Sequence, residues 1–182
     1  MLYPLLWMLA ASFRPENEIF TSASIIPSSW SIDAYFRGWN GLRTSFGVFF
    51  TNSFIISIAS VIGNVFACSL AAFAFARLEF RGRKIWFALM LMTLMLPYQV
   101  TLIPQYVLFR SIGWVDTFLP LVVPKFLAAD AFFIFLMVQF FRGLPKELDE
   151  AARMDGAGPW RIYWKIILPL STPVLATAAI FT

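Results

Sequence analysis

Residues 54–76 read FIISIASVIGNVFACSLAAFAFA, and this uncharged run of apolar and small residues decides the fold class. A helix of about 20 such residues, rising about 1.5 Å per residue, crosses the roughly 30 Å hydrocarbon core of a bilayer. The composition agrees, because 60% of the 182 residues are hydrophobic and only 13% are charged, against roughly 25% charged in an ordinary soluble domain. We therefore expect an all-α integral membrane protein.

Two further stretches, 85–104 and 118–141, are long enough to span a bilayer, and the apolar stretches 1–11 and 166–182 flank them. Residues 1–11 cover only about half a bilayer and residues 166–182 end without a polar flank. We expect both to be partial spans, so that residues 1–182 form a fragment of a single transmembrane domain. A signal peptide is the alternative for residues 1–11, but its basic n-region is missing there.

The distribution of basic residues predicts the orientation. Four of them follow the first full span and five follow the third: Arg77, Arg81, Arg83 and Lys84, then Arg142, Lys146, Arg153, Arg161 and Lys165. Two crossings separate these loops, so both face one side, and the positive-inside rule makes that side cytoplasmic. The connection 12–45 is then external. The net charge of +4 in so apolar a chain points to membrane lipid, not nucleic acid, as the charged surface it meets.

Several chemistries are excluded within this chain. It has no His and a single cysteine, Cys68, which excludes His/Cys zinc sites, disulfides and Ser-His or Cys-His catalysis. No Gly-Lys dipeptide occurs, so a phosphate-binding loop is absent and any ATP would have to bind another chain. A carboxylate metal site stays formally open. We expect no catalytic residue, no metal site and no cofactor bound by this chain.

Helix packing within the bilayer is predicted at two places. Ala59, Gly63, Ala67 and Ala71 recur every four residues, and such a stripe of small residues lets a neighbouring helix approach closely. We interpret it as a packing surface and not as a site. Pro97 removes a backbone donor from the second span and predicts a kink there.

Asp130 is the one acid inside a predicted span. An ionisable group in a bilayer is by default a candidate for the substrate path or for an interior pair. Lys125 lies five residues away, which is a poor helical spacing for direct pairing. Two interpretations stay open: Asp130 lines a water-filled path for a hydroxylated substrate, or it bonds to a neighbouring helix.

The segment 144–165 is the predicted cytoplasmic coupling loop, and with its continuation to residue 169 it reads LPKELDEAARMDGAGPWRIYWKIILP. Its pattern predicts a helix, a break and a second helix. Pro145 suits a first helical position, and the acidic residues that follow favour the positive end of the helix dipole. Gly156 is placed to end the first helix in a left-handed conformation, and Gly158-Pro159 begins the second.

One face of the first short helix is small and apolar. Leu148, Ala151, Ala152 and Asp155 recur at spacings of three and four, so they share a flank. Such a face fits a groove in a protein partner. The alternative is an amphipathic helix on lipid headgroups, which calls for bulky apolar anchors and a basic polar face, whereas this helix has alanines and acids.

The same loop resembles that of a known family. Glu150-Ala151-Ala152, three residues, Gly156, nine residues and Ile166-Ile167-Leu168-Pro169 match the E-A-A-x₃-G-x₉-I-x-L-P loop of ABC importer permeases without a mismatch. The flanking sequence is similar to the sugar-importing branch, in particular to the second permease of the maltose type. The similar segments are Pro4-Leu5-Leu6-Trp7-Met8, Asn52-Ser53, Leu102-Ile103-Pro104 and Leu168-Pro169-Leu170-Ser171 with Pro173.

The resemblance implies a fragment of the type I transmembrane domain of an ABC importer, with a cytoplasmic coupling helix, in the bacterial inner membrane. It also implies partners: two ATPase subunits that use ATP and Mg²⁺, a second permease subunit and an extracytoplasmic solute-binding protein. The chain itself is then a non-catalytic transport subunit. The ATPase-coupling residues implied by the resemblance, with Leu148 added from the shared face, are Leu148, Glu150, Ala151, Ala152, Asp155 and Gly156.

Two other classes of protein share some of these features. A secondary transporter or channel subunit would also have the spans and Asp130, but it has no need for a capped Ala-Ala helix in the cytoplasm. An intramembrane enzyme is disfavoured because the spans lack His and paired carboxylates.

Overall fold

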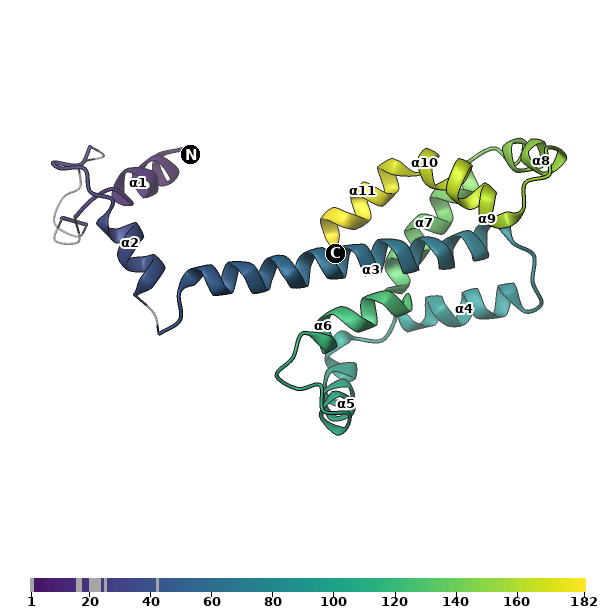
Figure 1. The fold of residues 1–182 in the computed structure, drawn as a ribbon, viewed down its shortest axis with the longest axis horizontal. Helices are drawn as coiled ribbons and strands as arrows, with labels where there is room; N and C mark the ends of the chain where they lie inside the picture. Colours follow the sequence, from purple (N-terminus) through teal and green to yellow (C-terminus); the bar gives the residue numbers. More distant parts are fainter. Residues whose placement is uncertain (1, 16–17, 20–23, 25, 42) are drawn as a thin grey trace. The chain divides into compact units, whose positions relative to one another are not determined.

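The computed structural model describes residues 2–15, 18–19, 24, 26–41 and 43–182, and within these residues every regular element is a helix, with no strand (Figure 1). The chain divides into two units, Met1–Phe54 and Ile55–Thr182. Position 1 of the expected first partial span lies outside the described residues. So do positions 16–17, 20–23, 25 and 42 of the expected external connection.

The first unit contains two short helices, α1 (Tyr3–Ala11) and α2 (Asp33–Asn40). Aromatic side chains pack near them: the ring of Phe13 lies 5.6 Å from that of Trp30 and 5.7 Å from that of Tyr35, centroid to centroid. The hydroxyl groups of Tyr35 and Ser12 add a 2.7 Å hydrogen bond. The expected external connection therefore carries a helix of its own.

The helix α3 (Phe46–Arg77) has 32 residues and includes the expected span 54–76, but it begins earlier. At Gly63 its stripe of small residues makes a close contact with a neighbouring helix, as predicted. Gly63 is buried, and a Cβ atom placed there would lie 2.5 Å from the ring of Phe126. Phe126 belongs to the 3-10 helix η2 (Val123–Leu127), so glycine is what allows η2 to approach α3.

The second expected span, 85–104, is two helices, α4 (Arg83–Thr93) and α5 (Tyr98–Ser111), at an angle of 97°. Pro97 lies directly before α5 with extended backbone angles, φ −60° and ψ 134°. The predicted kink is thus a complete break of the helix. The physical reason is that proline supplies no backbone donor and also disfavours helical geometry in the residue before it.

The third expected span, 118–141, is also interrupted. It consists of α6 (Leu119–Val122), η2 and α7 (Ala131–Gly143). Ala128 adopts a left-handed conformation with φ 52°, which separates η2 from α7. Over Leu119–Gly143 the helical stretch is nevertheless long and apolar enough to cross a membrane.

Four short helical segments complete the chain after α8 (Glu147–Met154). They are α9 (Pro159–Ile162), a π-helical turn at Tyr163–Ile167, α10 (Leu168–Leu170) and α11 (Thr172–Phe181). The segment Pro159–Leu170 meets α11 at 75°. Among the described residues two helices are long and apolar enough to span a membrane, or up to four if each bent pair is one span.

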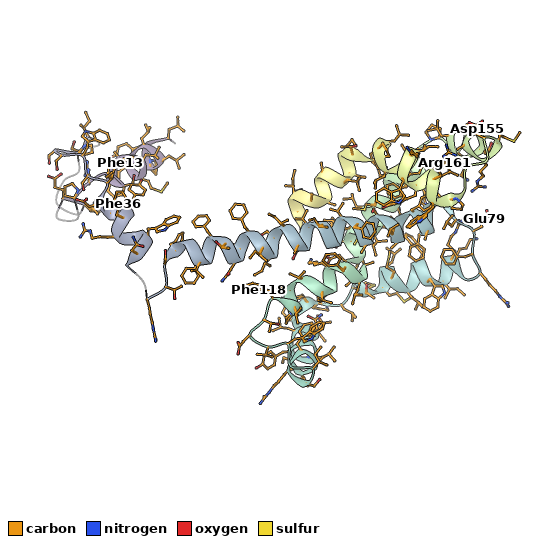
Figure 2. All side chains as sticks on the ribbon, in the orientation of Figure 1. Phe13, Phe36, Glu79, Phe118, Asp155 and Arg161 are labelled. Carbon is orange, nitrogen blue, oxygen red and sulfur yellow. The ribbon has the colours of Figure 1, made fainter. Side chains whose placement is uncertain are left out.

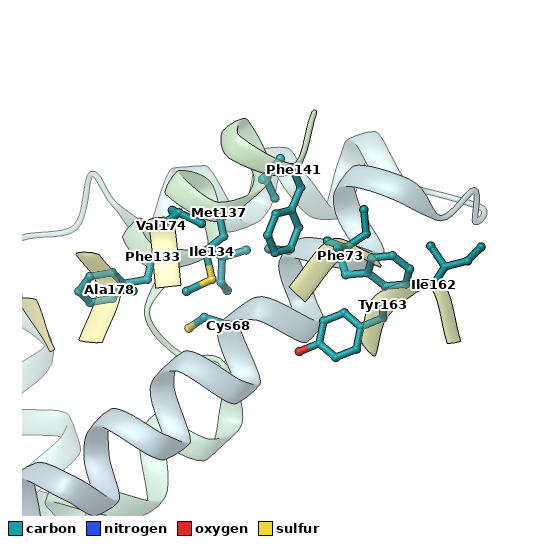
Figure 3. Packing of buried hydrophobic residues seen from close by; sticks show 13 residues of the cluster. Cys68, Phe73, Phe133, Ile134, Met137, Phe141, Ile162, Tyr163, Val174 and Ala178 are labelled. Carbon is teal, nitrogen blue, oxygen red and sulfur yellow. The ribbon is translucent and has the colours of Figure 1, made fainter. Parts of the chain in front are cut away.

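The core of the second unit lies where α3, α7 and the C-terminal helices meet (Figure 3). Its labelled members come from all three regions: Cys68 and Phe73 from α3, Phe133, Ile134, Met137 and Phe141 from α7, and Ile162, Tyr163, Val174 and Ala178 from the C-terminal segments. The cluster holds the end of α3 and the whole of α7 against the segment that follows the predicted coupling loop.

Polar side chains join the same elements inside the core. The hydroxyl groups of Ser69 and Tyr163, both fully buried, are 2.7 Å apart. The Asn64 amide donates to the Thr182 hydroxyl at 2.8 Å, and the Cys68 thiol donates to the Asn64 carbonyl at 3.1 Å. Such bonds matter in a bilayer because lipid offers no hydrophobic drive for helices to associate.

The contact at Gly63 can be tested by filling it. We expect Gly63→Leu to destabilise the protein by about 1–3 kcal/mol, because the added side chain overlaps the Phe126 ring. The melting temperature of the detergent-purified protein should fall. Adding Phe126→Ala should restore part of the loss, and Gly143→Ala is the control, since a Cβ at Gly143 meets nothing within 4 Å. Equal melting temperatures for Gly63→Leu and Gly143→Ala would contradict the packing described.

Candidate coupling site

The helix α8 forms as the sequence predicts, with small differences at its start. Its first turn carries three acidic residues, Glu147, Asp149 and Glu150, which suit the positive end of the helix dipole. Pro145 lies just before the helix and not at its first position. Figure 2 shows Asp155 at the end of α8, with Arg161 and Glu79 at the same end of the second unit. This is the end expected to face the cytoplasm.

A buried ion pair attaches α8 to the end of α3. The guanidinium Nη1 of Arg77 lies 3.1 Å from Oδ2 of Asp149, and the two side chains are only 3% and 9% exposed. Asp149 is the one buried residue of α8. Charges this deep are retained only when they are paired, because removing an ion from water costs several kcal/mol.

Arg77 also binds the end of α7. Its Nη2 atom donates to the carbonyl oxygen of Phe141 at 2.7 Å and to that of Leu144 at 2.8 Å. The last carbonyls of a helix have no partner within the helix, so a cation at this end is favourable on two counts, hydrogen bonding and the helix dipole. One side chain therefore joins α3, α7 and α8. Two atoms of the pair, Arg77 Nε and Asp149 Oδ1, remain buried without a hydrogen-bond partner.

The inward turn of Asp149 decides which side of α8 faces outward. Ala152 is half-buried and packs against the core cluster, whereas Ala151 is exposed. Leu148 is 38% exposed and Met154 is 88% exposed. The face expected from spacing grouped Ala151 with Ala152, but the structure separates them. The exposed apolar face consists of Leu148, Ala151 and Met154, and we call it the outer face of α8.

The remaining residues expected to take part in coupling lie around this face. Glu150 and Asp155 are exposed, and Asp155 directly follows the helix. Gly156 has φ 77°, which confirms the predicted left-handed end of α8. The amide of Ala157 donates to the Ala152 carbonyl at 2.8 Å across this turn. A Cβ at Gly156 would meet nothing within 4 Å, so only its backbone conformation calls for glycine.

A charged cavity of about 460 Å³ lies beside the ion pair, between the end of α3, the loop that follows it and α8. Its charged lining residues are Arg77, Glu79, Arg83, Lys146, Asp149, Glu150 and Arg153. Charges of both signs mix there, so the cavity has no strong preference for an anion or a cation. Among the described residues no group of three or more His, Cys, Asp or Glu side chains gathers as a metal ion would require.

Asp130 and Lys125 form an ion pair, contrary to the expectation from helical spacing. Lys125 Nζ lies 2.6 Å from Asp130 Oδ2, and the side chains are 29% and 36% exposed. The expectation was wrong because the residues between them are not α-helical. The 3-10 turn of η2 and the left-handed Ala128 fold the chain back, so that Asp130 meets Lys125 directly before α7 begins.

The sequence did not identify three residues of this site: the ion pair of Arg77 and Asp149, and Met154 on the outer face of α8. In the sequence Arg77 is recognisable only as one of the basic residues that predict the orientation. No local pattern indicates that it pairs with Asp149, which is 72 positions further along the chain (149 − 77). Helical spacing could have placed Met154 on the same face, since it lies three residues after Ala151, which lies three after Leu148.

The fold and the site together define a multi-span membrane protein with a capped helix-break-helix segment beside its basic loops. The family model described as "Binding-protein-dependent transport system inner membrane component" matches residues 63–182. The chain belongs to this family, which confirms the resemblance to ABC importer permeases and the expected inner-membrane location.

Individual relatives agree. The chain is 36% identical to the probable ABC transporter permease protein YurM of Bacillus subtilis, over 99% of this chain and 59% of the relative. It is 32% identical to the diacetylchitobiose uptake system permease protein NgcG of Streptomyces coelicolor, over 100% of this chain and 59% of the relative. The chain thus spans less than two thirds of the length of these relatives.

A solved structure also matches. A chain of a bacterial ABC transporter involved in the import of the acidic polysaccharide alginate superposes with a TM-score of 0.87 and 26% identity. The match covers 99% of this chain and 62% of that chain. Both the family and this structural neighbour support the all-α fold of an importer permease expected from the sequence.

The left-handed turn at Gly156 gives a prediction with an internal control. We expect Gly156→Val to speed hydrogen exchange of the Ala157 amide by about tenfold, because a β-branched residue disfavours the left-handed conformation by about 1–2 kcal/mol. Gly158→Val should have little effect, since Gly158 has φ −74° and equal free space. Equal protection of Ala157 in the two variants would argue against a conformational role for Gly156.

Proposed function

We propose that this chain is the permease subunit of an ATP-driven importer, and that α8 is the helix through which an ATPase subunit moves it. The single observation that carries the proposal is the outer face of α8, a small apolar surface on a helix that is anchored by one buried charge and ended by a left-handed glycine. A groove in a partner can enclose such a face because Ala151 adds little bulk.

The partners in this proposal are two ATPase subunits, a second permease and an extracytoplasmic solute-binding protein. ATP and Mg²⁺ are used by the ATPase subunits, and this chain holds no cofactor. Membership of a binding-protein-dependent family supports the assembly in general terms. The positive loops beside α8 support docking on the cytoplasmic side.

We assign the coupling role to Leu148, Glu150, Ala151, Asp155 and Gly156, and we add Met154. Leu148, Ala151 and Met154 supply the apolar contact, and Glu150 and Asp155 supply charge at its border. Ala152 contributes differently from its neighbour, because its half-buried methyl group packs against this chain's own core. Its role is to seat α8 rather than to touch the partner.

The proposed substrate is an oligosaccharide. The NgcG relative is named for diacetylchitobiose uptake and the structural neighbour for alginate import. We also propose that Asp130 borders the substrate path together with Lys125. Both side chains keep about a third of their surface exposed inside a span, and charged groups there face protein or water-filled cavities in preference to lipid.

The first prediction of the proposed function concerns the outer face of α8. We expect Ala151→Trp to reduce recovery of the ATPase subunit with the purified permease by at least about tenfold, a loss that corresponds to about 1.4 kcal/mol of binding free energy. Arg81→Trp, at an exposed position in the other basic loop, is the control. Ala152→Trp is a poor substitute because it also disturbs the core. Full recovery with Ala151→Trp would argue against a buried contact.

The second prediction separates an ATP-driven importer from a secondary transporter or channel. Proteoliposomes that contain the assembled complex should take up labelled diacetylchitobiose or alginate oligosaccharides only with ATP and the solute-binding protein present. Uptake should persist after ion gradients are collapsed, because nucleotide hydrolysis supplies the free energy. Uptake that follows an ion gradient and ignores ATP would refute the proposal.

The third prediction concerns Asp130. We expect Asp130→Asn to slow uptake of the same oligosaccharides by about tenfold, because Lys125 then keeps its charge inside the span without an anionic partner. Asp116→Asn is the matched control. Asp116 lies outside α5 and α6, and its φ of 63° is a conformation that asparagine tolerates. Unchanged affinity and rate in Asp130→Asn would remove it from the substrate path.

A further inference from the structure

We propose that Arg77 and Asp149 form a clamp that fixes the orientation of α8 relative to α3 and α7, so that a displacement of α8 is passed to both membrane helices. The inference deepens the proposed function and rests on it, since the displacement comes from the docked ATPase. In these terms Arg77 and Asp149 are positioning residues: neither belongs to the outer face of α8, and each acts through the helix it holds.

Few contacts other than the ion pair hold α8 in place. It has eight residues, and Asp149 is the only one of them that is buried. The half-buried Ala152 adds one methyl contact with the core. A helix this short is not stable by itself in water, so tertiary contacts must define its position. Of these tertiary contacts of α8, the ion pair is the one whose geometry constrains the orientation of the helix.

The Arg77 side chain contacts two elements at once. Its Nη2 atom binds the Phe141 and Leu144 carbonyls at the end of α7, while Nη1 binds Asp149 on α8. A guanidinium is planar and rigid, so three contacts from one group fix the angle between the elements as well as their separation. An apolar contact of the same area would let the helices slide.

The ion pair is poorly suited to a role in stability alone. Arg77 Nε and Asp149 Oδ1 are buried without partners, which is unfavourable, and well-packed apolar residues often stabilise a protein as much as a buried ion pair does. The pair contributes defined geometry, which apolar residues do not supply. Tight packing around Arg77 supports this role, since Phe141 is fully buried and belongs to the core cluster.

The test measures the position of α8 relative to α7 and does not need a known substrate. Spin labels are placed at Gln139→Cys on α7 and Glu147→Cys on α8, both exposed and outside the residues assigned to coupling, with Cys68→Ala to remove the native thiol. Distances are measured by pulsed electron spin resonance in the complex assembled with its partner subunits, without nucleotide and with ATP and vanadate. With Arg77 and Asp149 intact, we expect one narrow distance distribution that nucleotide leaves unchanged.

Asp149→Asn should broaden this distribution and make it depend on nucleotide. It removes the charge but keeps the two bonds from Arg77 to α7, so the core should persist. ATP hydrolysed per diacetylchitobiose imported should rise by at least about fivefold, the lower end of common coupling effects. Asp149→Glu should restore both readouts. Glu79→Gln is the matched control, because it also neutralises a carboxylate that lines the charged cavity and lies outside the coupling residues.

Arg77→Lys provides a second variant. It keeps the charge but loses the forked geometry, and it should give an intermediate width. A narrow, nucleotide-independent distribution in Asp149→Asn, or equal broadening in Glu79→Gln, would overturn the clamp. These results are separable from failure of the proposed function. If the ATPase is not recovered with the unmodified permease, the docking proposal fails, while the distance between α7 and α8 in the permease alone still reports whether the clamp exists.

Discussion

A buried guanidinium must find anionic or carbonyl partners, and the way Arg77 meets this requirement organises the cytoplasmic end of the protein. Arg77 is the last residue of α3, and its partners lie on α7 and α8, 64 to 72 positions further along the chain (141 − 77 and 149 − 77). Because the partners are distant in sequence, satisfying one side chain brings three helices together. The core cluster supplies most of the burial, but this group sets the angle at which α8 leaves the bundle.

Features that depend on neighbouring residues could be predicted from the sequence. The uncharged run in α3, the break at Pro97 and the left-handed end of α8 at Gly156 follow from local hydrophobicity, a missing donor and backbone freedom. The extent of the break was underestimated, since proline acts on the preceding residue as well as on its own bond. Family likeness then identified the loop without any long-range contact.

Features that depend on distant partners or on an irregular backbone could not be predicted. The spacing of Lys125 and Asp130 disfavours an ion pair only if the chain between them is an α-helix. The left-handed residue between them is Ala128 and not a glycine, so the sequence does not indicate the turn. The face predicted for α8 included Ala152, which the structure instead half-buries, on the helix whose Asp149 is turned inward to Arg77. The four apolar and four acidic residues of 147–155 look equivalent in the sequence until the distant charge of Arg77 is placed beside one of them, Asp149.

The interruptions in the membrane helices have a mechanical consequence. Where the chain turns at Ala128, and again around Pro97, no continuous ladder of backbone hydrogen bonds carries force along the axis. Each half of those segments can tilt without bending its partner. Between Ile55 and Arg77, by contrast, α3 is continuous, and it ends at Arg77, which forms the ion pair with α8. This part of α3 is the rigid element of the unit, so a displacement applied at Arg77 is transmitted along the helix as far as Ile55.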